Sequence, residues 1–302
     1  MRASGTAVVA GASSQLGLFL LPRLATGGYS VRAVSRGVHG KPVAAAEGVT
    51  WVAPGSIPAG PTDFFFSCGP LRLAREILEN TDGLKKAVVF STTSVFTKPG
   101  SPDEKERSMI REIAQEEDGL KTASAGRNIA LVIIRPTLVY GCGMDGNVSL
   151  LLRMGERTGL IPLSRHASGL RQPVHADDLA HLAVAAMQAD TGPLLEGEAC
   201  GGETLEFREM AARIASCGRR RIRLLALPPA VLNAAVRVAS KFGQWKGLNP
   251  EMVNRQAEDM VFDDTPFRDT LDWKPRPFSP TPEDFQIPGS VARYRLKAGS
   301  GS

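Results

Sequence analysis

A short glycine-containing turn near the N-terminus constrains the fold more than any other feature of the sequence. Residues 6–10 are apolar and predict a buried strand, and residues 15–26 predict a helix. Between them lies the turn Gly11-Ala-Ser-Ser-Gln-Leu-Gly17, in which Gly11 permits a tight bend and Gly17 permits close packing of helix on strand. A second strand at 29–35 completes a β-α-β unit. Because N–H groups at a helix start bind phosphate, the unit is typical of a dinucleotide-binding domain; a plain strand–helix turn without a nucleotide is the alternative.

Strands and helices continue to alternate through the first half of the chain. A buried parallel strand has a short apolar run, and a helix has a 3.6-residue period. Residues 37–62 carry only one short predicted strand, at 49–52, so a full strand–helix–strand repeat is not expected in this segment. Further strands are expected at 63–67, 86–91 and 130–135, and helices at 71–79 and 103–124. The pattern predicts an α/β protein with a Rossmann-type doubly wound parallel sheet.

The character of the sequence changes after Tyr140, where loops lengthen and Pro, Gly and Arg become frequent. This half predicts a smaller, mostly helical C-terminal cap that binds substrate over the carboxyl ends of the strands. We expect helices at 147–157, 176–188, 204–216, 228–242 and 250–260, with short strands near 194–199 and 221–226. The expected division is a Rossmann domain of residues 1–146 with about 173–200, a cap of 147–172 and 201–290, and a tail of 291–302.

The residues after the second strand indicate which dinucleotide binds. An NAD site places an acidic residue there for the ribose 2′-hydroxyl, but no Asp or Glu precedes Glu47. The strand ends in Ser35-Arg36, which can pair with a 2′-phosphate and stack on adenine. We therefore predict NADP(H) as the cofactor; a surface arginine in a loop is the alternative for Arg36. The expected phosphate-binding residues of the turn are Gly11, Ser13, Ser14, Gln15, Leu16 and Gly17.

Several motifs in order along the chain resemble the extended short-chain dehydrogenase/reductase family, most closely its NAD-dependent epimerase/dehydratase branch that acts on nucleotide sugars. The cofactor turn is one of them. The others are Ser91-Thr92-Thr93-Ser94-Val95-Phe96, Ile134-Arg135-Pro136-Thr137-Leu138-Val139-Tyr140-Gly141, Arg171-Gln172-Pro173-Val174-His175-Ala176-Asp177-Asp178-Leu179, Gly202-Glu203-Thr204-Leu205 and Leu271-Asp272-Trp273-Lys274-Pro275. The resemblance covers nearly the whole chain.

This resemblance implies roles for individual residues. Thr92 matches the Ser/Thr that hydrogen-bonds the reacting oxygen, and Thr93, Asn147 and Arg171 match substrate-binding positions, the last two on a diphosphate. Further residues expected along the cofactor are Ser91, Cys68, Gly69, Pro70, Pro136 and Val139. Simpler roles are open for three of them: Pro136 as a strand end, Asn147 as a helix N-cap, and Arg171 as an ion-pair partner of Asp177 or Asp178.

The family's catalytic pair, Tyr-x-x-x-Lys, is missing. The three tyrosines are Tyr29, Tyr140 and Tyr294, and none is followed four residues later by lysine. Alignment on the glutamate after the pair, Glu116 or Glu117, puts Ser108 or Met109 at the tyrosine position. Another group then supplies the proton, or no strong acid is needed, or the protein catalyses nothing. The conceivable substitutes are Lys98, Glu104, Ser108, Arg111 and Tyr140.

Composition limits the other function classes. The four cysteines show no CxxC spacing, and the four histidines no ligand spacing, so we predict no disulfides, no metal site and a cytoplasmic location. His175 is expected to fix a strand-to-helix turn instead. The net charge of +5 is not gathered in an aromatic-rich basic patch, which argues against nucleic-acid binding. The apolar stretches 16–21 and 224–239 are too short or broken to span a membrane.

Two hypotheses about function follow. The first is an NADP(H)-dependent oxidoreductase or epimerase that acts on a nucleotide sugar or a similar phosphorylated small molecule, and analogy suggests a homodimer packed through the helices near 72–80 and 103–124. The second is a catalytically silent NADP(H)-binding protein with a structural or redox-sensing role. The missing pair favours the second, as does the Pro-Pro helix at 228–242, whose apolar face could dock a partner or lipid; ordinary packing within the cap is the alternative for that face.

Overall fold

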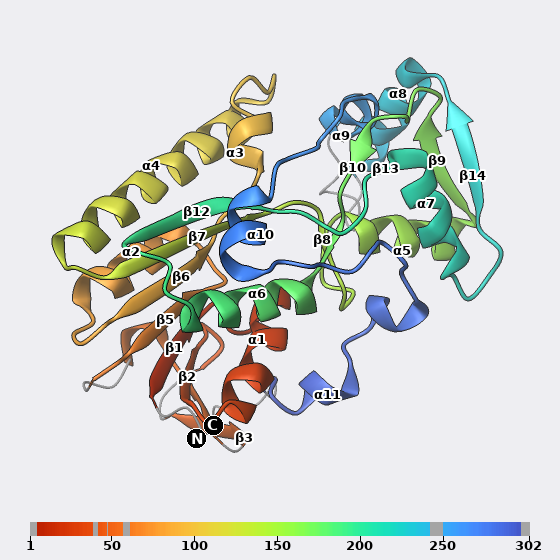
Figure 1. The fold of residues 1–302 in the computed structure, drawn as a ribbon. Coiled ribbons are helices and arrows are strands. Elements are labelled where there is room, and N and C mark those ends of the chain that lie inside the picture. Colours follow the sequence, from red (N-terminus) through yellow and green to blue (C-terminus); the bar gives the residue numbers. More distant parts are fainter. Residues whose placement is uncertain (1–4, 39–41, 47, 57–60, 242–249, 297–302) are drawn as a thin grey trace.

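The computed structural model describes residues 5–38, 42–46, 48–56, 61–241 and 250–296. Their centre is an eight-stranded sheet with the order β12-β7-β6-β5-β1-β2-β4-β3 (Figure 1). All neighbouring strands are parallel except β3, which pairs antiparallel with β4 at one edge. The strands are β1 Thr6–Ala10, β2 Ser30–Val34, β3 Val43–Ala46, β4 Val49–Val52, β5 Phe64–Ser67, β6 Lys86–Phe90, β7 Ala130–Pro136 and β12 Leu194–Ala199. The predicted Rossmann-type sheet is confirmed.

Helices cover both faces of the sheet. On one face α1 (Gln15–Thr26) packs beside α6 (Ala176–Gln188), and on the other α2 (Leu71–Asn80) packs beside α4 (Glu104–Gly126). Each face has its own apolar cluster, as expected for parallel strands that are buried on both sides. Strand order reverses beside β1, which has β2 on one side and β5 on the other. Open α/β sheets bind ligands outside the carboxyl ends of the strands at such a point.

A smaller set of elements lies beyond the carboxyl ends of the strands (Figure 1). It contains short strand pairs, β9 with β14 and β10 with β13, among several helices. Its elements are α5 Val148–Thr158, β9 Leu160–Ser164, β10 Leu170–Arg171, β13 Leu205–Glu206, α7 Phe207–Ser216, β14 Arg223–Leu227, α8 Pro229–Ala239 and α9 Glu251–Asn254. Two two-residue strands, β8 (Val139–Tyr140) and β11 (Val174–His175), pair where the chain leaves and re-enters the sheet domain.

The C-terminal region returns to the sheet domain. Helix α10 (Thr265–Leu271) lies against β12 and α6, and the side chain of Phe267 is fully buried there. Helix α11 (Gly289–Ala292) contacts α1, and Trp51 Nε1 donates to the Tyr294 carbonyl at 3.1 Å. Residues 291–296 of the expected tail are therefore packed, whereas 297–302 lie outside the described residues.

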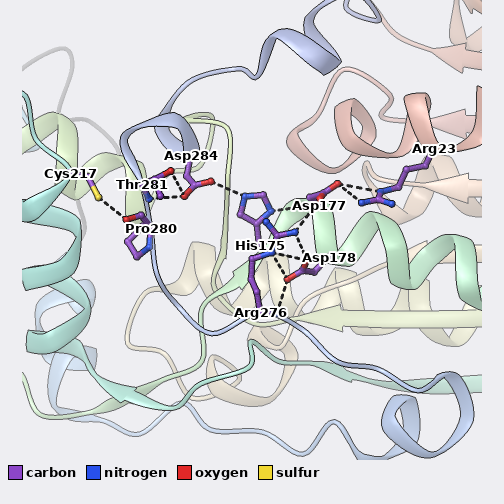
Figure 2. A network of polar contacts seen from close by, with 9 residues as sticks. All are labelled: Arg23, His175, Asp177, Asp178, Cys217, Arg276, Pro280, Thr281 and Asp284. Carbon is purple, nitrogen blue, oxygen red and sulfur yellow. Dashed lines mark hydrogen bonds and ion pairs between the residues drawn. The ribbon is translucent and has the colours of Figure 1, made fainter. Parts of the chain in front are cut away.

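A polar network holds the start of α6 against α1 and the C-terminal region (Figure 2). His175 Nδ1 accepts the N–H of Asp177 at 3.0 Å, so its Nε2 carries the proton and donates to Asp284 at 3.1 Å. Asp177 pairs with Arg23 at 2.6 Å, and Arg276 pairs with Asp177 and Asp178. As expected, His175 fixes the strand-to-helix turn, and it caps α6 itself.

Candidate functional site

The glycine turn has the geometry that was expected of a phosphate-binding loop. Gly11 has φ +65°, and a Cβ on it would come within 2.6 Å of the Cys68–Gly69 backbone. A Cβ on Gly17 would come within 2.5 Å of the Ala12 backbone, so helix α1 packs on the turn only because this residue is glycine. Ser14 is the N-cap of α1, and its hydroxyl accepts the N–H of Gly17 at 3.2 Å.

The residues predicted for the adenosine end of the cofactor lie at the end of the neighbouring strand β2. The hydroxyl oxygen of Ser35 is 3.5 Å from that of Ser13 and accepts the N–H of Gly37 at 3.2 Å. Arg36 is exposed, and none of the described residues forms an ion pair with it. The guanidinium is therefore accessible to a ligand at the turn.

The third strand end at this edge belongs to β5, on the other side of β1. Gly69 lies against Gly11, since a Cβ on Gly69 would be 3.3 Å from the Gly11 Cα. Pro70 is exposed and occupies the N-cap position of α2. Burial raises the pKa of the Cys68 thiol to about 12, so this cysteine is a protonated thiol and not a nucleophile.

These residues suit a dinucleotide. Two buried polar atoms at this edge, Gln15 Nε2 and Ser67 Oγ, have no hydrogen-bond partner among the described residues. Buried polar groups are normally paired, so a polar ligand in contact with them would satisfy an otherwise costly arrangement. Together with the N-terminus of α1, the turn offers the backbone N–H donors that a pyrophosphate needs.

A cavity of about 290 Å³ lies where the sheet domain meets the cap. The strand-end residues Thr92 and Thr93 line it on one side, and residues of α5, α7, α8 and α9 line it on the other. It brings together the predicted residues Thr92, Thr93, Asn147 and Arg171. Among the described residues 24 line it, and 13 of these are apolar and lie mostly on the cap side.

The three hydroxyl residues after β6 have different bonding. Ser91 donates to the carboxylate of Glu117, and Thr93 donates to the Pro136 carbonyl at 3.2 Å. Thr92 instead accepts the N–H of Ser94 at 3.1 Å, and its own O–H has no acceptor among the described residues. Thr92 is therefore the residue of this group that can donate to a ligand oxygen in the cavity.

The five candidate proton donors separate by position. Tyr140 is buried between His175 and Phe278, away from the cavity, and burial raises its pKa. Three more of these candidates also lie outside the cavity and are exposed on α4: Glu104, Ser108 and Arg111. Lys98 alone of the five lines the cavity. It follows helix α3 (Ser94–Thr97) directly after the Thr92 strand end.

Lys98 belongs to a charged cluster at the cavity. Its Nζ is 3.1 Å from Glu106 of α4, and Arg255 from the cap makes two contacts of 3.0 and 3.2 Å with the same carboxylate. Burial opposes ionisation of Glu106, but hydrogen bonds from Arg255, Ser101 and Lys98 lower its pKa to about 2. Glu106 is thus an anion that positions two cations and ties the cap to the sheet domain.

Arg171 and Asn147 make other contacts than the simpler roles expected for them. The Arg171 guanidinium is buried over the ring of Phe207 and donates to the backbone carbonyls of Leu170, Arg255 and Glu258, so it pairs with neither Asp177 nor Asp178. Burial lowers its pKa to about 10. Asn147 occupies the N-cap position of α5, but its side chain makes no capping bond. Both residues line the cavity, and diphosphate binding by either one stays a prediction.

The two glutamates that could follow the missing catalytic pair have different surroundings. Glu117 is buried and accepts hydrogen bonds from Arg135, the shortest at 2.6 Å, whereas Glu116 pairs with Arg75 of α2. Aligned on Glu117, the tyrosine position falls on Met109, which is 48% exposed and cannot transfer a proton. Aligned on Glu116 it falls on Ser108, and the choice between the two stays a prediction.

The comparisons with known proteins concern the fold. An epimerase from Methanothermobacter thermautotrophicus is similar over 94% of this chain and 90% of its own, with 13% identity and a TM-score of 0.66. The enzyme WbmF of Bordetella bronchiseptica, in complex with NAD+ and UDP, is similar over 97% of this chain and 93% of its own, with 14% identity and a TM-score of 0.66. UDP-glucose 4-epimerase of Thermotoga maritima, with UDP-glucose, is similar over 96% of this chain and 98% of its own, with 15% identity and a TM-score of 0.63. The chain has their fold. No protein-family model and no curated protein matches the sequence.

Some features of the site were not predicted. The apolar cap side of the cavity and the Glu106–Arg255 contact are both formed by residues more than a hundred positions apart in the sequence. No sequence motif marks either feature. The predicted helix 228–242 is α8, whose Leu232 and Val236 line the cavity while Val231 and Val238 are exposed. Among the described residues there is no group of three or more potential metal ligands and no helix long and apolar enough to cross a membrane.

Proposed function

We propose that the protein is an NADP(H)-dependent enzyme of the extended short-chain dehydrogenase/reductase type. The observation that carries this proposal is a juxtaposition at one sheet edge. The glycine turn and Arg36 follow β1 and β2, while the free hydroxyl of Thr92 follows β6 and faces the cavity. Because the strands are parallel, a dinucleotide laid across their carboxyl ends from Arg36 would run toward Thr92.

In this proposal the chain's own residues hold the cofactor and orient the substrate. The N-terminus of α1 and Ser14 bind the pyrophosphate, Ser35 and Arg36 bind the 2′-phosphate, and Pro136 and Val139 border the nicotinamide. When bound, the nicotinamide supplies or accepts a hydride at a carbon of the substrate. Thr92 donates a hydrogen bond to the oxygen on that carbon and fixes its position.

The proton that accompanies hydride transfer needs a source, since the sequence lacks the Tyr-x-x-x-Lys pair. We assign it to Lys98, the proposed donor that lines the same cavity as Thr92. An ammonium group held by Glu106 can give a proton to a developing alkoxide or take one from an alcohol once deprotonated. The substrate class suggested by the complexes of the similar folds, one with UDP-glucose and one with UDP, is a nucleotide sugar or a related phosphorylated compound.

A catalytically silent NADP(H)-binding protein is the second candidate, and the missing catalytic pair favours it. A deuterium-transfer experiment separates the two. The full chain is incubated with NADP+ and with nucleotide sugars or alkyl glycosides deuterated at their carbinol carbons, and deuterium in the nicotinamide is measured by mass spectrometry. The enzyme proposal predicts transfer from a sugar to the nicotinamide; binding of NADP+ without transfer from any of these sugars supports the silent protein.

A pair of variants at the cavity makes this test specific. Thr92→Val should abolish transfer and leave NADPH affinity within about two-fold, because only the hydroxyl is lost. Thr97→Val, also at the cavity, is the control and should keep transfer. Equal loss in both variants would argue against the role of Thr92.

We further propose a homodimer packed through α2 and α4, in the cytoplasm. The proposal rests on analogy with the family that the sequence resembles. Sedimentation of the purified chain tests it, since a dimer should dissociate when charge is introduced on the exposed faces of these helices and a monomer should not change.

A further inference from the structure

The chemistry of the cavity indicates a narrower class of substrate than the fold does. Six side chains of the cap form what we term the apolar wall: Leu151, Met154, Phe207, Leu232, Val236 and Met252. All but Leu232 are only half-buried, so they present apolar surface to the space between them. Apolar surface of this kind is stabilised when a ligand removes it from water, by about 25 cal/mol per Å².

Two glutamines on the same side of the cavity use their side-chain oxygens within the protein. Gln256 accepts the N–H of Ser164 at 2.8 Å, and Gln172 accepts the N–H of Phe262 at 2.8 Å. Asn147, whose side chain makes no capping bond, lies at the start of α5 and lines the cavity apart from the apolar wall.

The two arginines at the cavity are also engaged. Arg171 donates three hydrogen bonds to backbone carbonyls, and Arg255 makes a two-point contact with Glu106. These contacts use only part of the five N–H donors of each guanidinium. The apolar wall has no donors, so charged or polar groups of a ligand are not stabilised along it.

We propose that the substrate is an amphiphile, with a hydroxylated, sugar-like head beside Thr92 and an apolar chain along the apolar wall. The proposal rests on the proposed function for the identity of the reacting end, but the chain-binding surface is independent of it. A sugar attached to an alkyl or isoprenoid chain has this chemistry. It would meet hydroxyls and Lys98 at the sheet side and the apolar wall at the cap side.

Helix α8 supplies a matched pair of test positions. Val236 lines the cavity, whereas Val231, five residues earlier on the same helix, is 52% exposed and does not line it. Val236→Asp places a charge in the apolar wall, and Val231→Asp places the same charge in solvent. Val236→Phe keeps the wall apolar but fills part of its space, which provides a variant that should fold even if Val236→Asp does not.

The experiment is a calorimetric titration of the full chain, with and without NADPH, using glucose, hexyl, octyl and decyl β-glucoside below their micelle concentrations, and UDP-glucose. We expect affinity to rise about two- to four-fold per methylene along the alkyl series. Val236→Asp should remove the dependence on chain length and Val231→Asp should preserve it. Val236→Phe should keep the affinity for hexyl glucoside and lower the affinity for decyl glucoside by about ten-fold or more.

Other outcomes overturn the proposal. Equal affinity for glucose and decyl glucoside, tighter binding of UDP-glucose than of every alkyl glucoside, or equal losses in the Val231 and Val236 variants would each exclude a chain-binding wall. The two proposals fail separately. If affinity depends on chain length but NADPH does not bind, the amphiphile site stands and the proposed cofactor is wrong. If NADPH binds but affinity does not depend on chain length, the proposed cofactor stands and the amphiphile site is wrong.

Discussion

The guanidinium of Arg255 makes a two-point contact with the carboxylate of Glu106, at 3.0 and 3.2 Å. This contact joins a cap element to helix α4 of the sheet domain, beside the cavity in which we place the substrate. Both side chains are nearly buried, with exposed fractions of 13% and 14%. Glu106 is therefore shared between Arg255 of the cap and Lys98, which contacts the same carboxylate.

The stability of the protein should depend on pH through Glu106. Its pKa falls from an ordinary 4.5 to about 2 on folding, so its contribution is fully present above about pH 5 and is lost as the pH falls through the folded value. Glu106→Gln should lower the free energy of unfolding by about 2–3 kcal/mol near neutral pH. Urea unfolding over a pH series should show the difference between wild type and variant shrinking toward about pH 2. A difference that stays constant with pH would contradict the assignment.

The buried pair of Glu117 and Arg135 gives a second prediction. Both side chains are less than 9% exposed and lie 2.6 Å apart, so Glu117→Gln removes the most buried carboxylate from Arg135, which keeps Glu196 at 2.6 Å. We expect a loss of about 3 kcal/mol in the free energy of unfolding. Glu112→Gln, on the exposed face of the same helix, is the control and should change it by less than about 0.5 kcal/mol. Similar losses of unfolding free energy in both variants would contradict a specific stabilising role of the Glu117–Arg135 pair.

Substitution of the turn glycine should affect both folding and cofactor binding. Gly17→Ala brings a methyl group to within 2.5 Å of the Ala12 backbone and moves α1 away from the turn. We expect destabilisation of about 2 kcal/mol or more and loss of the thermal shift on adding NADPH. Gly126→Ala, at the end of α4 with open space around it, should be neutral or stabilising. An intact NADPH shift in Gly17→Ala would mean that the dinucleotide lies elsewhere.

Much of the sheet domain could be predicted because its signals are local. The apolar run and glycines around β1, and the periodicity of α4, gave boundaries within a few residues of Thr6–Ala10 and Glu104–Gly126. Strand β3 was missed because its residues Val43–Ala46 are alanine-rich and pair only at the edge of the sheet. Its register depends on β4, which no local pattern encodes.

The cap could be predicted less well, since its structure depends on contacts between distant residues. The expected helix 250–260 is instead α9 followed by a short 3-10 turn at Arg255–Ala257. Arg171 donates to the carbonyls of Arg255 and Glu258 and so competes with continued helical hydrogen bonding there. The sequence predicts that the apolar face of the helix at 228–242 docks a partner or lipid or packs within the cap, whereas its Leu232 and Val236 line the cavity. Periodicity cannot distinguish a core face from a cavity wall.

The affinities of the full chain for NADPH and NADH, in wild type and in Arg36→Ala, show whether Arg36 selects the cofactor. Wild type should prefer NADPH, and Arg36→Ala should weaken NADPH binding about ten- to one-hundred-fold, because a charge-assisted contact with the 2′-phosphate is lost. The affinity for NADH should change by less than about two-fold. Equal weakening of both nucleotides, or a wild-type preference for NADH, would contradict this role of Arg36.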